Sequence, residues 1–177
     1  SHACSYFIQP LSSKIVLFPA LLLTFHPSQK PGKAGNLGLF IGQRLAEQGW
    51  GVPTWPKEYG GAGLTDADAK IINREIRKAG STNPIMLITG MGATMVGPTM
   101  LEYGTQEQKA RHLKGMASGE VRWCLGLSEP GAGSDLAGLS TKAVRDGDHY
   151  VVTGQKIWTS FAQTADYCEL LVRTDPD

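Results

Sequence analysis

The sequence predicts an α+β fold in which an all-α domain precedes a β domain. Apolar residues recur every three to five positions from Asn36 onward, which is the period of an amphipathic helix. After Glu120 the pattern changes to alternation with a period of two, and an Asp-Gly-Asp turn separates two such stretches in the manner of a β-hairpin. The chain ends in Thr-Asp-Pro-Asp, a turn signal, so we expect a β domain that is cut short.

Residues 1–35 differ in character from the rest of the chain. The apolar run from Ile15 to Phe25 contains Pro19 and is too short to span a bilayer, and Lys14 gives it only a weak basic flank. A signal peptide is one interpretation, and a non-native segment is another. A signal peptide is not favoured, because no small-residue cleavage site can be placed. We therefore expect residues 1–35 to be an atypical, poorly ordered leader.

The helical domain is expected over residues 36–120, and its first helix begins at Asn36 and stops at Gly49. The next stretch, from Gly49 to Leu64, is rich in glycine and proline, which excludes regular structure and predicts a fixed loop. Thr65 can cap a second helix, because aspartates follow in the first turn and basic residues occupy the last turn. The buried stripe of that helix should consist of Ile72, Ile76 and Ala79.

Two further helical segments complete this domain. The methionine-rich stretch from Pro84 to Leu101 predicts a nearly all-buried helix, or two short helices that divide near Gly97. Thr105 and Gln108 have the spacing of a capping box, which opens a short polar helix. Residues 36–120 are therefore expected to form an all-helical domain, with helices as their only regular structure.

The β domain is expected over residues 121–177. Its alternating or apolar stretches predict strands at Val121 to Ser128, Ser140 to Arg145, His149 to Thr153 and Tyr167 to Arg173. The second and third of these flank the Asp-Gly-Asp turn and should pair as the hairpin.

Charge and cysteine content exclude several kinds of function. Lysine and arginine number 17 against 16 for aspartate and glutamate, so no long-range field gathers nucleic acid or anionic lipid, and neither is expected as a partner. The three cysteines are an odd number and far apart in the sequence, which predicts a reducing, cytoplasmic compartment and no structural metal. His26, His112 and His149 lie in polar or turn contexts, which predicts solvated side chains.

The most informative segment runs from Leu125 to Asp135 and reads Leu-Gly-Leu-Ser-Glu-Pro-Gly-Ala-Gly-Ser-Asp. It leaves a strand, turns at Pro130 and supplies glycines where backbone amides can meet an anionic or polar ligand. Ser128 and Ser134 place hydroxyls on either side of the turn. On these residues alone, a tight glycine turn capped by Asp135 and a ligand-binding loop are both open.

A second segment, from Val152 to Ser160, carries an aromatic side chain and a hydroxyl two residues apart. If this segment is a strand, Trp158 and Ser160 lie on the same side of it. That arrangement suits a flat heteroaromatic ligand, because the indole offers an aromatic surface and the hydroxyl a hydrogen bond. A core tryptophan beside a hydroxyl that bonds to backbone is the alternative interpretation.

Taken together, these segments resemble the acyl-CoA dehydrogenase family. Ser-Glu-Pro-Gly-Ala-Gly-Ser-Asp (128–135), followed by Gly-Gln-Lys-x-Trp-x-Ser (154–160), is similar to two signatures of that family's middle domain. Upstream, Trp-Pro-x-Glu-Tyr-Gly-Gly-x-Gly (55–63) and Tyr-Gly-Thr-x-Glu-Gln-Lys (103–109) resemble its N-terminal helical domain. The resemblance covers residues 36–177, with Leu125 and Ser128 as mild departures from the usual aromatic residue and threonine.

The resemblance implies a fold, a cofactor and a set of site residues. The β segment would be an incomplete, β-barrel-like middle domain that holds FAD, and the family's C-terminal helical domain would be absent. FAD-dependent oxidation of an acyl-CoA thioester to the 2-enoyl-CoA is the implied activity, in fatty acid or acyl-CoA metabolism. The implied FAD-binding positions are Leu125, Leu127, Ser128, Gly133, Ser134, Trp158, Thr159 and Ser160, and Ser134 would also touch the acyl-CoA.

The resemblance also limits what these residues are expected to do alone. The family's catalytic base, a glutamate, lies in the C-terminal domain, so the catalytic residue here is unknown and Glu129 has no support as a base. A truncated, non-catalytic fragment is therefore one alternative, and an acyl-CoA oxidase of the same fold is another. Electron-transfer flavoprotein or a similar acceptor would be the redox partner, and family members are homo-oligomers.

Overall fold

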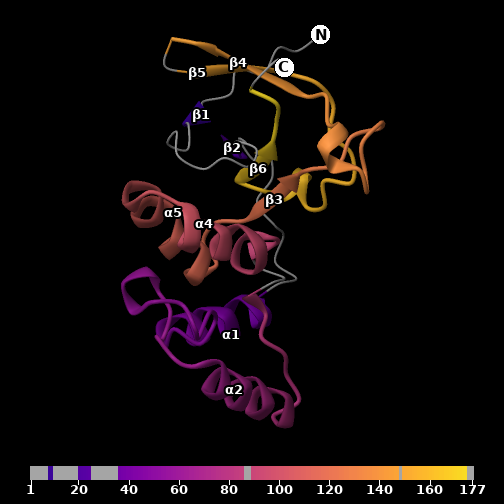
Figure 1. Cartoon of the computed structure of the whole chain (residues 1–177). Coiled ribbons are helices and arrows are strands. Elements are labelled where there is room, and N and C mark those ends of the chain that lie inside the picture. Colours follow the sequence, from indigo (N-terminus) through magenta and orange to yellow (C-terminus); the bar gives the residue numbers. More distant parts are fainter. Residues whose placement is uncertain (1–7, 10–19, 25–35, 86–88, 148, 175–177) are drawn as a thin grey trace. The chain divides into compact units, whose positions relative to one another are not determined.

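The computed structural model of the chain describes residues 8–9, 20–24, 36–85, 89–147 and 149–174. It divides into two compact units, one formed by Gln29–Arg122 and the other by Trp123–Asp177 together with strands that precede Gln29. The first unit is helical and the second contains the strands (Figure 1). The predicted order, a helical domain before a β domain, is confirmed.

The helical unit contains four α-helices among the described residues, joined by short 3₁₀ and π-helical turns. The α-helices are α1 (Asn36–Glu47), α2 (Asp66–Lys78), α4 (Gly97–Tyr103) and α5 (Gln106–Ser118). A 3₁₀ turn, Lys57–Tyr59, lies in the loop after α1, and a π-helical turn, Gly92–Val96, leads into α4. Gly49 has a φ of 69° just after the end of α1, which confirms the predicted stop.

Local side-chain hydrogen bonds explain where α2 and α5 begin. The Thr65 hydroxyl accepts from the Asp68 backbone N–H at 3.2 Å, and the Asp68 carboxylate accepts from the Thr65 N–H at 3.3 Å. Thr105 and Gln108 repeat this reciprocal pair at 3.3 and 2.9 Å. Both predicted caps are confirmed, because each depends only on residues three positions apart.

Burial in the helical unit differs in places from the sequence prediction. Ala79 is exposed and Ile72 and Ile76 are only half-buried, so the expected stripe of α2 is wrong in part. Met95 is 47% exposed, which contradicts an all-buried stretch before α4. His112 is 6% exposed rather than solvated, because it lies on the face of α5 that packs into the unit.

The start of α4 at Gly97 agrees with the alternative of two helices that divide there. The core of this unit is built from large apolar side chains of the loop after α1, α4 and α5. Its buried members include Val52, Trp55, Val96, Met100, Leu113, Met116 and Ala117.

The strand-containing unit has a four-stranded sheet with the order β1-β2-β6-β3 and a separate hairpin. The sheet strands are β1 (Ile8–Gln9), β2 (Ala20–Thr24), β3 (Trp123–Gly126) and β6 (Tyr167–Leu171). β6 pairs parallel to β3 and antiparallel to β2. The hairpin joins β4 (Lys142–Asp146) to β5 (His149–Thr153), as predicted. The described strands form no closed barrel.

Two strands come from the part of the chain that precedes α1. β1 and β2 pair with each other, and Leu22 of β2 lies opposite Glu169 of β6. The rest of residues 1–35, including the predicted solvated His26, lies outside the described residues.

The core of the strand-containing unit brings together cysteines that are distant in sequence. Cys124 and Cys168 are register partners on the parallel strands β3 and β6, and both are buried with free thiols. Sheet pairing therefore brings together two cysteines that are far apart in the sequence. On the other face, Trp123 stacks on Tyr167 with ring centroids 4.8 Å apart. The core also contains Ala143, Ala165, Leu170 and Val172.

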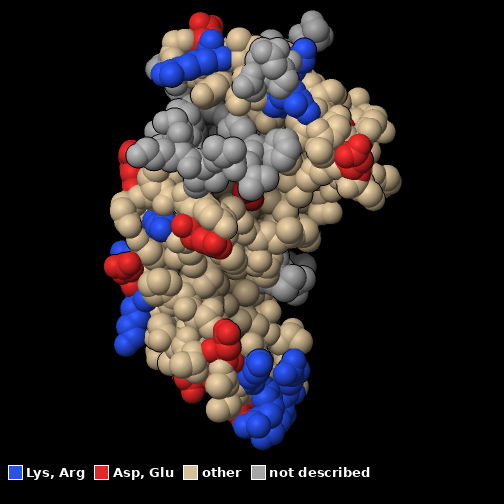
Figure 2. Space-filling view, viewed as in Figure 1, with Lys and Arg blue, Asp and Glu red and all other residues tan. Residues whose placement is uncertain are grey.

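The described surface carries charges of both signs. Figure 2 shows basic side chains gathered over the end of α2, whose last turn contains Arg77 and Lys78. Across the parts of the chain that can be described, no helix has both the length and the apolar character needed to cross a bilayer.

Candidate functional site

The first motif forms a loop that leaves the end of β3 and closes in a tight turn. The Glu129 N–H donates to the Ala132 carbonyl at 2.8 Å, and the Ala132 N–H donates to the Glu129 carbonyl at 3.1 Å. Pro130 and Gly131 occupy the two central positions of this turn, as their residue types favour. Gly133 and Ser134 follow it and are exposed.

The second motif lies beside the first. The Ile157 N–H donates to the Ser128 carbonyl at 2.9 Å, so Leu127 and Ser128 are neighbours of the segment that carries Trp158. This segment is not a strand, because β5 ends at Thr153 and residues 155–160 have no ladder pairing. The prediction that a strand aligns Trp158 with Ser160 is therefore wrong.

Backbone strain and exposure coincide at Trp158. Its φ is 58°, and Phe161 at 68° is the only other described residue besides glycine with a positive φ. The Trp158 side chain is 86% exposed, so the alternative of a core tryptophan is also wrong. In the short stretch from Trp158 to Phe161, the Ser160 N–H donates to the Trp158 carbonyl at 2.9 Å. Strained backbone of this kind persists only where its surroundings fix it, and it concentrates at functional sites.

A buried ion pair joins the two motifs. Lys156 Nζ lies 2.8 Å from Glu129 Oε1 and also donates to the Leu127 carbonyl at 2.9 Å. Glu129 accepts further hydrogen bonds from the Ser140 N–H at 2.6 Å, the Ser140 hydroxyl at 2.8 Å and the Thr141 N–H at 2.9 Å. The side chains of Lys156 and Glu129 are 9% and 3% exposed. The carboxylate thus binds three separate stretches of chain together.

This environment decides the protonation state of Glu129. Burial opposes its ionisation, but the hydrogen bonds from Lys156, Thr141 and Ser140 outweigh burial and hold the pKa of Glu129 far below its usual range. A general base needs a free lone pair in reach of substrate and a pKa near the working pH. Glu129 lacks both features, since four hydrogen bonds occupy its two carboxylate oxygens.

Two further contacts support the loop from the hairpin side. Gly154 packs so closely on Thr141 that an added Cβ would lie 2.7 Å from the Thr141 Cα, and its φ is 155°. Arg173 donates to the Ala137 carbonyl at 2.8 Å and to the Leu139 carbonyl at 3.3 Å. These bonds fix the stretch that follows Ser134.

The structure places the predicted site residues in two groups with different exposure. Leu125, Leu127, Ser128 and Thr159 are half-buried, whereas Gly133, Ser134, Trp158 and Ser160 are exposed. Leu125 lies on β3, and the remaining residues lie on loops. Hydrogen bonds bring Leu127 and Ser128 against Lys156 and Ile157, while Gly133 and Ser134 lie beyond the tight turn. Within the described residues, no group of three or more acidic, cysteine or histidine side chains could hold a metal ion.

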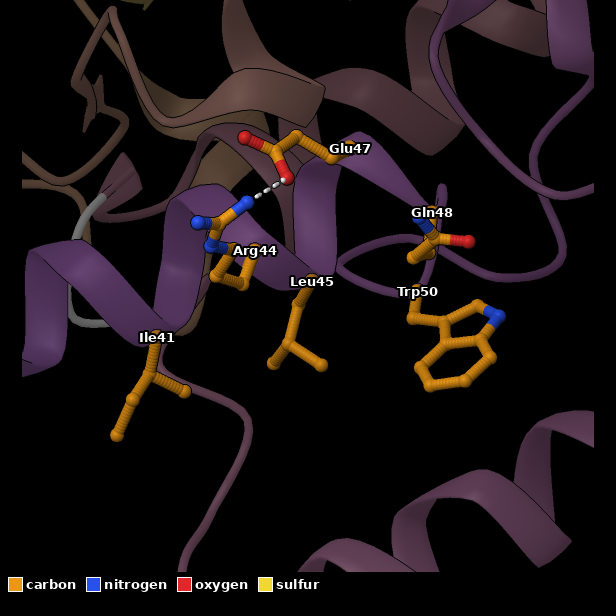
Figure 3. A pocket seen from close by; sticks show the side chains of 6 residues that line it. All are labelled: Ile41, Arg44, Leu45, Glu47, Gln48 and Trp50. Atoms are coloured by element: carbon orange, nitrogen blue, oxygen red, sulfur yellow. Dashed lines mark hydrogen bonds and ion pairs between the residues drawn. The ribbon is translucent and has the colours of Figure 1, made fainter.

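A hollow of about 490 Å³ lies elsewhere, on the helical unit. Ile41 and Leu45 of α1 and Trp50 of the following loop point toward the same open space (Figure 3). Arg44, the basic residue on its border, is paired with Glu47 at 2.9 Å. None of the predicted site residues lines this hollow, so we do not assign the site to it.

Sequence reasoning missed the roles of Lys156 and Glu129. The first motif contains the acidic residues Glu129 and Asp135, and the second contains the basic residue Lys156. Buried charges are almost always paired, so this complementarity was an available signal. The pairing itself could not be read from the sequence, because the two residues meet only after the hairpin forms between them.

Comparisons with known proteins agree with the motifs. The family model described as "Acyl-CoA dehydrogenase, N-terminal domain" matches residues 33–120, and the one described as "Acyl-CoA dehydrogenase, middle domain" matches residues 124–177. Acyl-CoA dehydrogenase FadE26 of Mycobacterium tuberculosis is 48% identical over 134 residues, which are 76% of this chain and 32% of the relative. The chain spans about a third of the length of the curated relatives that it matches.

Solved structures show the same likeness. The ChsE4-ChsE5 complex from Mycobacterium tuberculosis matches with 46% identity and a TM-score of 0.64, covering 80% of this chain and 35% of that one. A glutaryl-CoA dehydrogenase from Mycobacterium smegmatis in complex with FADH2 matches with 26% identity and a TM-score of 0.60, covering 77% and 35%. The chain thus has the fold of part of these solved proteins.

Proposed function

This chain belongs to the acyl-CoA dehydrogenase family, and from that premise we propose that it contributes the flavin-facing segments of an enzyme that oxidises acyl-CoA thioesters to 2-enoyl-CoA. One observation carries the proposal. The two motifs that resemble the family's flavin signatures are bonded to each other through Ile157 and Ser128, and they leave Trp158 exposed in a strained backbone conformation.

The residues present fit FAD as the cofactor. A Cβ added at Gly133 would meet no atom within 4 Å, so the space beside this backbone is open to a ligand. The exposed indole of Trp158 offers an aromatic face, and the exposed hydroxyls of Ser134 and Ser160 offer hydrogen bonds. A flat heteroaromatic molecule with polar ring edges has the complementary chemistry. A related glutaryl-CoA dehydrogenase has been solved in complex with FADH2.

We assign separate roles to the chain's own residues. Leu125, Leu127, Ser128, Gly133 and Ser134 would bind the cofactor from the β3 loop, and Trp158, Thr159 and Ser160 would lie along its ring. Backbone and hydroxyl donors at the ring edge stabilise negative charge, and Ser134 would also contact the acyl-CoA. When bound, FAD supplies the acceptor for a hydride from the thioester. The residue that removes the α-proton is not assigned among these.

A second candidate follows from the share of the relatives that the chain covers. Because that share is about a third, these residues alone could bind FAD or thioester weakly and fail to turn over substrate. Anaerobic addition of acyl-CoA to the FAD-loaded chain separates the candidates. Bleaching of the flavin absorption would favour an active enzyme, and its absence in the presence of bound FAD would favour a non-catalytic fragment.

The partners and location of the protein are also proposals. An electron-transfer flavoprotein or a similar acceptor would reoxidise the flavin. In an acyl-CoA oxidase, dioxygen would be the acceptor instead. The solved ChsE4-ChsE5 relative is a complex, which supports assembly with further subunits. The free thiols of Cys124 and Cys168 suit a reducing compartment such as the cytoplasm.

The direct test is the visible spectrum of the purified chain after addition of FAD and removal of the unbound excess. We expect a flavin band in the wild type and its loss or weakening in Trp158→Ala. Trp50→Ala is the matched control, since Trp50 is also exposed but lies in the helical unit. A folded wild type that retains no flavin would contradict autonomous cofactor binding by this chain.

A further inference from the structure

Each of the two motifs contributes one charge to a single buried pair, and neither charged residue is among those assigned to the cofactor. Glu129 comes from the first motif and Lys156 from the second. Burying two ions costs several kcal/mol each by desolvation, and apolar residues of similar volume often stabilise a fold as well. The pair therefore needs a reason other than stability.

The contacts of Lys156 supply that reason. Its ammonium group bridges the Leu127 carbonyl and the Glu129 carboxylate, so it spans both sides of Ser128. The next residue, Ile157, donates its N–H to the Ser128 carbonyl. Consecutive residues of one motif are thus bonded to consecutive residues of the other, which fixes the register between the two loops.

The fold leaves room for this side chain. A Cβ at Gly126 would lie 3.5 Å from Lys156 Cγ and 2.5 Å from Leu170 Cδ1. The 3.5 Å distance is an ordinary van der Waals contact, so the aliphatic part of Lys156 lies against the end of β3, and the close approach there is to Leu170. The Lys156 side chain is 9% exposed, and this burial strengthens the attraction of its charge to Glu129.

The register between the two loops matters for Trp158, which lies two positions after Lys156. Trp158 has almost no packing of its own, since its side chain is 86% exposed, yet its backbone is held at a positive φ. Such a conformation is costly for a non-glycine residue and requires external restraint. The bonds to Ser128, Leu127 and Glu129 come immediately before it and supply that restraint.

We propose that Lys156 and Glu129 are positioning residues that preorganise Trp158, Thr159 and Ser160 against Leu127 and Ser128 for flavin recognition. They act through the loop backbones and do not touch the reacting atoms. This inference rests on the proposed function for its flavin part, whereas the positioning of the loop can be measured without any ligand.

The test compares Lys156→Met, Glu129→Gln and Lys156→Arg in the full chain by amide hydrogen exchange and FAD titration. Exchange of the Ile157 amide reports the contact between the motifs. The Ala143 amide, which bonds to the Arg173 carbonyl at 2.9 Å, reports the rest of the same unit. Lys78→Met is the matched control, because Lys78 pairs with Glu75 at 2.9 Å on the exposed surface.

We expect Ile157 exchange to accelerate about tenfold or more relative to Ala143 in Lys156→Met and Glu129→Gln, since each leaves one buried charge uncompensated. Lys156→Arg should recover part of the loss, and Lys78→Met should change neither amide. FAD should bind about tenfold or more weakly to the two disruptive variants.

Two results would overturn the inference. One is unchanged Ile157 exchange in both disruptive variants, and the other is equal acceleration of Ile157 and Ala143, which would indicate a general loss of stability. If the wild type binds no FAD, the proposed function fails for this chain, while the exchange ratio still decides whether the pair positions the loop.

Discussion

Lys156 Nζ lies 2.8 Å from Glu129 Oε1 in a site where both side chains are almost fully buried. The carboxylate also accepts from Ser140 and Thr141, so every one of its neighbours favours the ionised form. Removal of one partner leaves the other charge without compensation, which costs about 3–5 kcal/mol in buried pairs. The two loops that meet at this contact should therefore lose more stability than the rest of the strand-containing unit when either partner is removed.

Acid should destabilise the chain through Glu129. Its pKa in the folded state is lowered from an ordinary value of 4.5, so the unfolded state takes up the proton first as the pH falls. The stabilisation is fully present above pH 4.5 and is lost progressively below it. Urea unfolding between neutral and acid pH should show this decline in the wild type. In Glu129→Gln, the part of the pH dependence of the unfolding free energy that is due to this carboxyl group should vanish. An unchanged pH dependence would refute the assignment of the acid effect to Glu129.

His112 should act in a higher pH range. Burial, assisted by the nearby charge of Arg111, lowers the pKa of His112 from 6.5 to about 4. Because the unfolded state binds the proton first, stability should fall as the pH drops from 6.5 toward 4. Urea unfolding of His112→Gln over the same pH range should lack the loss of stability due to His112. It should keep the loss at lower pH that is due to Glu129. A His112 resonance that titrates near 6.5 in the folded chain would contradict this expectation.

Gly154→Ala should destabilise the loop that follows the hairpin. The added Cβ would collide with Thr141, and overpacking of this kind costs about 1–3 kcal/mol. Gly131→Ala is the matched control, because a Cβ there meets no atom within 4 Å. Thermal unfolding should separate the two variants, and an equal effect would mean that the approach of Gly154 to Thr141 is not restrictive.

Thr105→Ala should destabilise the helical unit by about 1 kcal/mol, since it removes the side-chain half of the capping box with Gln108. Thr105→Ser retains the hydroxyl and should stay close to the wild type. Urea unfolding of the pair measures the difference directly. If serine and alanine destabilise equally, the hydroxyl does not cap α5.

Features that depend on near neighbours in the sequence were predictable. The caps at Thr65 and Thr105, the stop at Gly49 and the β4-β5 hairpin each involve residues within one turn or one hairpin, so residue type and spacing suffice. The order of a helical domain and a β domain follows from the same local periodicities.

Features that depend on distant contacts were not predictable. The Ile157 N–H is bonded to the distant Ser128 carbonyl and the next residue, Trp158, has a positive φ, so local alternation wrongly indicated a strand. The adjacency of Cys124 and Cys168 arises from the pairing of β3 with β6. The pair of Glu129 and Lys156 likewise joins two separate motifs. A search that considers one motif at a time therefore does not find it.

The central claim is that the two motifs together form a flavin-binding edge, and amide NMR of the labelled full chain during FAD titration tests it most directly. We predict saturable shifts at the amides of the proposed site, with α1 and α2 unaffected. Those amides are Leu125, Leu127, Ser128, Gly133, Ser134, Trp158, Thr159 and Ser160. Shifts that appear in only one of the two motifs, or that concentrate in the helical unit, would contradict the claim.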